Sequence, residues 1–261
     1  MDIGIAGWAI VRRFKDEQKP LALLDFPRVA KEEFGIYHLE LNNLFMASKD
    51  EAYCGEVVAA AREAGVTLWG MAVDGTGDLS LLDEAKRQES LANALAYFDI
   101  ASWLSLTYFR VNTGGSAESG PEELAACIKS FRALAEEGAR RGIKIATENH
   151  GGLATQPDNM VKLIQGVGLD TMASLPDYGN FDDSFRYEGM AKIMPYAVGV
   201  HAKWNKRDGG RIDIPRMVQI TRDGGYDGPI FIEDGKGDDH RAVLQLKGAL
   251  MACMPEYEDI I

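Results

Sequence analysis

Residues 143–148 read IKIATE, and three later runs repeat this arrangement of apolar residues ending in one polar group: TMASLPD at 171–177, AVGVH at 197–201 and PIFIE at 229–233. The terminal residues are Glu148, Asp177, His201 and Glu233. Burying a charged group is costly unless it is paired or binds a cation. If the runs are consecutive parallel strands, these side chains meet at one rim of the sheet. Three carboxylates and one imidazole predict a site for Mn2+, with Mg2+, Co2+ or Zn2+ as alternatives.

The alternative is that each carboxylate caps the following helix or pairs with a nearby Lys or Arg. That explanation would suffice for a single residue. Four such residues in register on four successive strands favour the metal site.

Strand-like and helix-like segments alternate about eight times along the chain. Strands are predicted at 3–10, 36–41, 67–73, 104–112, 143–148, 172–177, 197–203 and 230–234. Helical periodicity runs through 50–64, 81–101 and 121–141. Such alternation implies right-handed βαβ crossovers and a parallel sheet. Eight units in 261 residues, without a linker or low-complexity tract, predict an α/β protein with one (β/α)8 TIM-barrel domain over residues 1–261.

The composition excludes several classes of partner. The net charge of −12 disfavours nucleic acid and anionic membranes, which are bound mainly through Lys and Arg. No apolar run approaches the length of a membrane span, and the first ten residues, MDIGIAGWAI, look like a strand. The three cysteines are distant from one another and share no metal-binding spacing. We therefore expect a cytoplasmic protein with a small-molecule sugar substrate, and a homodimer or homotetramer as its candidate assemblies.

Several motifs resemble those of the xylose isomerase-like TIM barrels, the sugar phosphate isomerase/epimerase superfamily. They are TENHGG at 147–152, DYGNF at 177–181, HAK at 201–203 followed by Arg207, and GYDG at 225–228 before Glu233. The resemblance implies that the Glu, Asp, His, Glu order is a metal quartet. It also implies that Glu148 and Glu233 are catalytic and move protons on opposite faces of the substrate.

The chain departs from the ketohexose 3-epimerases at two places. Asn180 stands where those enzymes have a His three residues after the sixth-strand Asp. The run 148–151, ENHG, replaces the Glu-Pro-Leu-Asn that often follows the fifth strand.

Other polar residues near the strand ends are candidates for substrate binding. Glu40 ends the second strand and is expected either to orient a catalytic group or substrate hydroxyl, or to form a buried ion pair with Arg110. His150 is assigned to substrate or proton relay, with a loop hydrogen bond as the alternative. Lys203 and Arg207 are expected to contact substrate, or else to neutralise the acidic rim.

Three tryptophans fall near strand ends, where an aromatic face suits the apolar face of a sugar. They are Trp8, Trp69 and Trp204, and packing at the barrel mouth is the alternative for each. Asn180 completes the set of candidate substrate-binding residues.

The predicted activity is metal-dependent isomerisation or epimerisation of a small ketose, keto-sugar or sugar phosphate by enediolate proton transfer. A lyase, either a keto-inositol dehydratase or a 3-keto-glycoside eliminase, is the alternative on the same scaffold. An apurinic-site endonuclease is a remote alternative, because that enzyme needs several zinc-binding histidines and this chain has four in all. A fourth possible function is a sugar-binding barrel without turnover.

Overall fold

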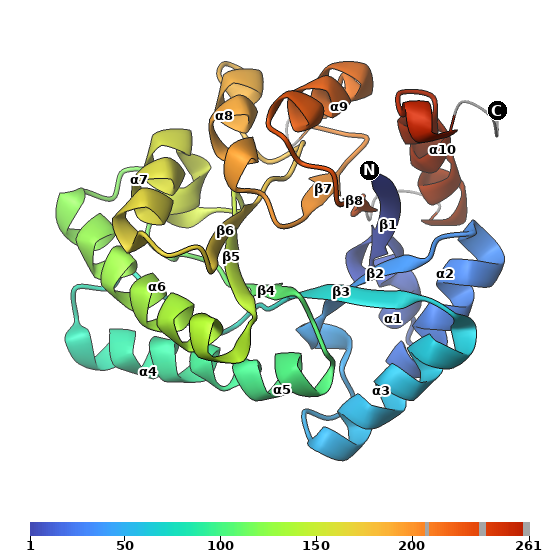
Figure 1. The fold of residues 1–261 in the computed structure, drawn as a ribbon, viewed down its shortest axis with the longest axis horizontal. Coiled ribbons are helices and arrows are strands. Elements are labelled where there is room, and N and C mark those ends of the chain that lie inside the picture. The colour runs from blue at the N-terminus through green and yellow to red at the C-terminus, as the bar shows by residue number, and fades with distance from the viewer. Residues whose placement is uncertain (207–208, 235–238, 258–261) are drawn as a thin grey trace.

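The computed structural model describes residues 1–206, 209–234 and 239–257 of the chain. Within these ranges the strands form one eight-stranded parallel sheet in the order β6-β5-β4-β3-β2-β1-β8-β7. Helices lie between the strands and surround them (Figure 1). The strands are β1 Asp2–Ala6, β2 His38–Asn42, β3 Thr67–Ala72, β4 Tyr108–Arg110, β5 Lys144–Glu148, β6 Met172–Leu175, β7 Val200–Ala202 and β8 Pro229–Ile232.

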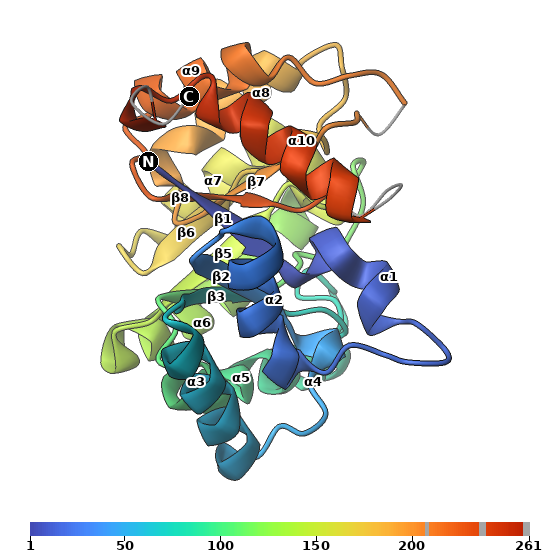
Figure 2. The same cartoon turned by 90° about the vertical axis from the view of Figure 1, so that its right-hand side faces the viewer.

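The α-helices form the outer layer of this barrel, and α10 packs beside α9 and α2 to complete the ring (Figure 2). In the described ranges they are α1 Val11–Phe14, α2 Phe26–Phe34, α3 Glu51–Ala64, α4 Glu84–Leu95, α5 Tyr97–Trp103, α6 Pro121–Arg141, α7 Pro157–Val167, α8 Arg186–Ile193, α9 Ile214–Asp223 and α10 Asp239–Met251.

Two helices begin and end as the sequence predicts. Asp50 caps α3 by accepting a hydrogen bond from the backbone N–H of Tyr53. α6 starts at Pro121 and stops at Gly142, whose φ of 71° is accessible to glycine at little cost. By contrast, the single helix predicted over 81–101 is two helices, α4 and α5, which meet at Ala96.

Three predicted strands are longer than the observed ones by three residues or more. The prediction of strand over 7–10 is wrong, because Gly7–Ile10 is a 3-10 helix. A Cβ on Gly7 would lie 2.8 Å from Asn42 Oδ1, so the chain there turns against the end of β2. Residues 104–107 are also not strand, since α5 ends there and Ser105 turns the chain with φ 55°. The seventh strand begins at Val200 and not at residue 197.

The barrel closes between β6 and β7 through isolated bridges and not through a full ladder. Ser174 pairs with Ala197, and Asp177 pairs with His201. The intervening Pro176 has no N–H to donate, but its carbonyl accepts from the His201 N–H at 2.8 Å. The closing seam therefore places two of the predicted ligands side by side.

A buried tyrosine fills the barrel beneath this rim. Tyr108 of β4 packs with Ala146, Leu175 and neighbouring inward side chains. Two glycines make room for it: a Cβ on Gly70 would lie 2.3 Å from the Tyr108 ring, and one on Gly199 would lie 2.5 Å from its hydroxyl. Tyr108 thus forms the floor on which the polar groups at the rim rest.

Candidate metal centre

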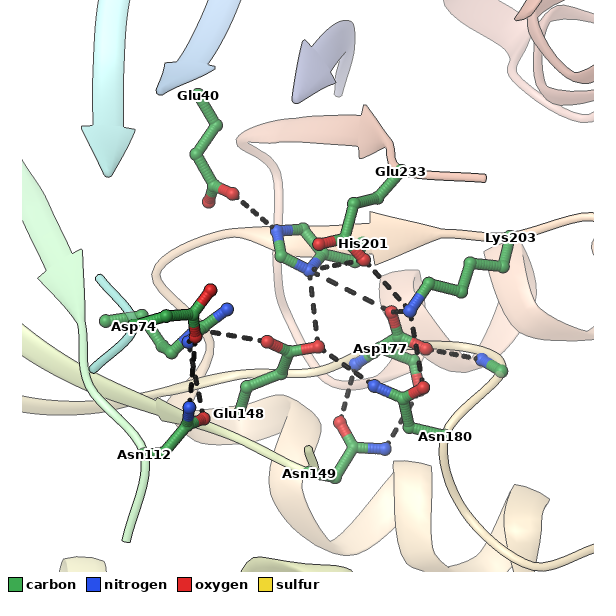
Figure 3. A network of polar contacts seen from close by, with 12 residues as sticks. Glu40, Asp74, Asn112, Glu148, Asn149, Asp177, Asn180, His201, Lys203 and Glu233 are labelled. Carbon is green, nitrogen blue, oxygen red and sulfur yellow. Dashed lines mark hydrogen bonds and ion pairs between the residues drawn. The ribbon is translucent and has the colours of Figure 1, made fainter. Parts of the chain in front are cut away.

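The four predicted ligands lie together at the carboxyl ends of β5, β6, β7 and β8. One ligand atom from each of Glu148, Asp177, His201 and Glu233 lies within 4.8 Å of the others, and all four residues are buried. His201 Nδ1 lies 3.5 Å from both Glu148 Oε1 and Glu233 Oε2, and 3.9 Å from Asp177 Oδ2. Figure 3 shows the four side chains turned toward a common point.

Two of the atoms that face this point lack the hydrogen bonds that buried polar atoms normally make. His201 Nδ1 has no hydrogen-bond partner, and Asp177 Oδ2 has none either, although the Lys203 ammonium nitrogen lies 2.7 Å from it. Buried polar atoms are nearly always satisfied, so these two atoms call for another partner. Oxygen and imidazole nitrogen atoms at this spacing fit a divalent cation.

The outer nitrogen of His201 is fixed by a buried carboxylate. Glu40 Oε1 lies 2.8 Å from His201 Nε2, and the Tyr108 hydroxyl donates to Glu40 Oε2. With Glu40 as its acceptor, Nε2 carries the proton, which leaves the Nδ1 lone pair for a cation. Of the two roles expected for Glu40, orienting a functional residue is the one this geometry supports. The ion pair with Arg110 is not formed.

Arg110 instead supports the first ligand. Its Nε lies 3.1 Å from Glu148 Oε2, and its NH1 donates to Asp74 Oδ1 at 2.7 Å. Asn112 Nδ2 also donates to Asp74 Oδ1, at 3.1 Å. Arg110 is thereby held in place and turned toward Glu148.

An asparagine supports the second ligand from the neighbouring strand. Asn149 Oδ1 accepts from the Asp177 N–H at 2.7 Å, and its Nδ2 donates to the Asp177 carbonyl at 3.0 Å. Through this side chain, the residue after β5 remains hydrogen-bonded to the backbone after β6, beyond Pro176. The backbone that carries Asp177 is therefore fixed.

Lys203 and Asn180 bridge the ligands on the solvent side. Lys203 Nζ lies 2.7 Å from Asp177 Oδ2 and 2.9 Å from Glu233 Oε2, and donates to Asn180 Oδ1 at 3.3 Å. Asn180 Nδ2 in turn donates to Glu148 Oε1 at 2.9 Å. Both expectations for Lys203 are thus compatible with its position, since it neutralises the acidic rim and also lines a pocket.

Burial and crowding shift the protonation of the cluster. Desolvation and the neighbouring glutamates raise the pKa of Asp177 to about 6, against the opposing effect of Lys203. Burial would also raise the pKa of Glu148, but Arg110 and His201 outweigh it and lower that pKa. Burial would lower the pKa of His201, yet the carboxylates of Glu233 and Glu40 raise it well above its usual value. The metal-free cluster therefore holds protons that a cation would have to displace.

A pocket of about 300 Å³ opens beside the cluster at the same rim. Its wall includes four of the predicted substrate-binding residues, namely Trp8, His150, Asn180 and Lys203, together with the ligand Glu233. The pocket thus brings together residues from the first, fifth, sixth, seventh and eighth βα units.

Other predicted substrate-binding residues lie elsewhere. Trp69 is the third residue of β3 and packs edge-on against His38, which lies 3.6 Å from Asp2 at the opposite end of the barrel. Trp204 is not part of the pocket wall, and its ring lies beneath the guanidinium group of Arg211. The positions of Trp69 and Trp204 favour the packing alternative over contact with substrate. Arg207 lies outside the described residues.

The histidines do not form a zinc cluster in the described part of the chain. His38 lies at the far end of the barrel, and His240 lies beside Glu33 on the surface. The remote endonuclease alternative therefore lacks the histidines that it needs. Among the described helices, none combines the length and apolar character needed to span a lipid bilayer.

Several supporting residues were missed by sequence reasoning. Tyr108, Asn149, Asp74 and Asn112 carry no metal-type pattern of their own, and Asp234 accepts hydrogen bonds from the backbone of the loop after β7. Asn149 had one usable signal, because it directly follows a predicted ligand.

Fold and site together define a TIM barrel with a three-carboxylate, one-imidazole cluster at the catalytic rim. The family profile described as xylose isomerase-like TIM barrel matches residues 29–250, so the chain belongs to that family. A sequence search of curated proteins found no match.

Solved structures with the same fold have low sequence identity. A 3-keto-D-glucoside 4-epimerase from E. coli matches with a TM-score of 0.77 at 16% identity, over 97% of this chain and 100% of that one. The probable 3-DHS dehydratase of petrobactin synthesis from Bacillus anthracis matches with 0.75 at 14%, over 96% and 98%. The IolI protein, solved with a zinc atom, matches with 0.76 at 10%, over 98% of each chain. At these identities the likeness establishes the fold alone.

Proposed function

We propose that the protein is a divalent-metal-dependent enzyme that moves a proton at the carbon next to the carbonyl group of a small keto-sugar, as an isomerase or epimerase. One observation carries this proposal. Glu233 belongs to the cation cluster and also forms part of the pocket wall, so one carboxylate touches both the cation position and the substrate space. The fold shared with a keto-glucoside epimerase supports the substrate class.

The roles of the residues follow from their contacts. A bound cation would supply Lewis-acid polarisation of the substrate carbonyl. Glu233 takes the α-proton from the pocket side. Glu148, which Arg110 keeps ionised, lies on the opposite face: it takes the proton there in the reverse direction, and in the forward direction a water molecule beside it returns a proton to the carbon.

Pocket residues orient the substrate. Lys203 donates a hydrogen bond to a substrate oxygen, and Trp8 and His150 border the ring. We assign Arg207 to the same task from its sequence position. Mn2+ is the proposed working cation because carboxylate oxygen and imidazole together suit it. The unpaired cysteines agree with the expected cytoplasmic location.

The test is a screen of keto-sugars and inososes in D2O with Mn2+, in which deuterium at the α-carbon is measured by NMR or mass spectrometry. We expect incorporation that EDTA abolishes. Glu233→Gln and Glu148→Gln should each lose about 10²-fold or more of the exchange rate, the scale of general base catalysis. Exchange at the parent rate in either Gln variant with metal bound would show that this glutamate is only a ligand.

A lyase is the second candidate, favoured by Asn180. This amide carries no titratable proton, and both its oxygen and its nitrogen are engaged with Lys203 and Glu148. An elimination needs only one base: Glu233 removes the α-proton, the bond to the β-oxygen breaks, and that oxygen takes up the proton from Glu233 and leaves as water. The same D2O incubations distinguish the two outcomes, because elimination yields an unsaturated ketone with ultraviolet absorbance and proton transfer yields an epimer or isomer.

A further inference from the structure

A second cavity, of about 470 Å³, adjoins the pocket beside the cation cluster. Asn180 belongs to the walls of both, and its side chain touches the ligand Glu148. The second cavity therefore begins one residue away from the cation cluster. A substituent on a substrate ring held at the cluster would pass Asn180 to enter it.

The wall of this second cavity comes from loops at the catalytic rim. Ala117 follows β4, and Thr155 and Gln156 follow β5. The remaining lining residues follow β6 and are Asn180, Phe181, Asp182, Asp183, Phe185 and Arg186. These are the loops that carry substrate specificity in TIM barrels. The two cavities thus open on the same face of the barrel.

The lining offers an aromatic group and an amide that has no partner. Phe185 is half-buried, and its ring lies 5.9 Å from that of the buried Phe181. The side chain of Gln156 makes no hydrogen bond to any residue in the described ranges. An aromatic face together with a hydrogen-bonding amide suits a polar ring with one apolar face.

The charges in this cavity disfavour an anion. Asp182 and Asp183 are exposed carboxylates in the wall. The buried Arg186 is already engaged, because its Nε lies 3.2 Å from Asp183 Oδ1 and its NH1 donates to the Tyr178 carbonyl at 3.0 Å. Lys206 Nζ lies 2.6 Å from Asp183 Oδ2. A phosphate group would therefore meet acids and cations that are already paired.

We propose that this second cavity binds a neutral ring joined glycosidically to the keto-sugar, so that the substrate is a glycoside and not a free monosaccharide or a sugar phosphate. The identity of the ring at the cation cluster rests on the proposed function. The neutral ring itself is either a second sugar or an aromatic aglycone, which share an apolar face.

The experiment measures binding and requires no turnover. Dissociation constants for the Mn2+-loaded protein are determined by calorimetry for methyl, phenyl and glucosyl glucosides, in both α and β forms. A ring-bearing glucoside should bind about tenfold more tightly than the matching methyl glucoside, the scale of one aromatic contact plus a hydrogen bond. Tighter binding of the phenyl ligand would indicate an aromatic aglycone, and tighter binding of the glucosyl ligand would indicate a second sugar.

Gln156→Ala and Phe185→Ala should each reduce this preference at least threefold. Leu82→Ala, which truncates an exposed side chain outside both cavities, is the control and should keep the parent preference. Equal affinity for methyl and ring-bearing glucosides overturns the inference, as does a preference unchanged in Gln156→Ala, or tighter binding of glucose 6-phosphate than of any glycoside. Because α-proton exchange plays no part in this measurement, the subsite and the proposed reaction can fail separately.

Discussion

At the scale of single residues, Glu40 decides how His201 is presented. Its carboxylate accepts from Nε2 and is itself held by the Tyr108 hydroxyl, so Nδ1 points into the cluster. Outer partners of this kind fix both the tautomer and the ring orientation of a ligating histidine. Glu40 is not one of the residues that line the pocket.

Glu40→Gln should therefore weaken Mn2+ binding by about 10- to 100-fold, the usual cost of losing such an outer partner. The amide retains the shape but can present its NH2 group to Nε2, which permits the wrong tautomer. Calorimetric titration with Mn2+ measures the effect, with the exposed Glu188→Gln as the matched control. An unchanged dissociation constant would show that Glu40 is only a buried structural residue.

Protonation of the cluster predicts a pH dependence of metal binding. Asp177 has a pKa raised to about 6, and the pKa of His201 is raised well above its usual value. A cation binds only the deprotonated forms, so protons leave as it binds. Affinity should fall as the pH drops from 8 to 5, by about tenfold per pH unit for each proton displaced. Titrations in buffers of different ionisation enthalpy count the released protons, and a dissociation constant that does not change with pH would refute this assignment.

At the scale of the elements, the residues at the strand ends were predictable from the sequence. The side chains that hold those residues in place were not. The apolar runs ending in Glu148, Asp177, His201 and Glu233 reveal both the strands and the cluster, because the carboxyl ends of parallel strands meet at one edge. The supporting contacts join elements far apart in the sequence, such as Glu40 of β2 with His201 of β7. Those contacts depend on strand register and inward direction, which periodicity alone does not determine.

The strand boundaries failed for a related reason. Apolar residues continue past β1 and precede β4, yet there they form a 3-10 helix and the end of α5. Gly7 at this turn lies too close to Asn42 for a Cβ, and no local pattern in the sequence marks that approach. Trp8 reaches the pocket because of that turn.

The packing of Tyr108 beneath the rim gives a prediction at this scale. Gly199→Ala places a Cβ 2.5 Å from the Tyr108 hydroxyl and 2.8 Å from Leu175, so the seam between β6 and β7 must shift. We expect a loss of about 1–3 kcal/mol in the free energy of unfolding, measured with urea. Gly199→Ala should cost less in a Tyr108→Phe background than in the parent, because the clashing oxygen is gone, while Tyr108→Phe alone carries the cost of the lost hydrogen bond to Glu40. Equal stability of Gly199→Ala and the parent would mean that the barrel interior around Tyr108 has room for a methyl group.

At the scale of the whole molecule, closure of the barrel produces the site. The seam between β6 and β7 pairs Asp177 with His201, and β5 and β8 bring a glutamate to either side. The net charge of −12 attracts cations to the protein and opposes anionic partners. The position of the four predicted ligands therefore depends on the complete ring of strands.

The most direct test of the central claim, that this cluster is a metal centre, is the stoichiometry of Mn2+ binding. Calorimetric titration of the parent protein should give one Mn2+ per chain, together with a rise in the melting temperature. Asp177→Ala and His201→Ala should bind none at this site and show no thermal stabilisation, while circular dichroism shows the parent fold. One Mn2+ per chain in both variants, at parent affinity, would contradict the account and leave the cluster a purely structural feature of the barrel.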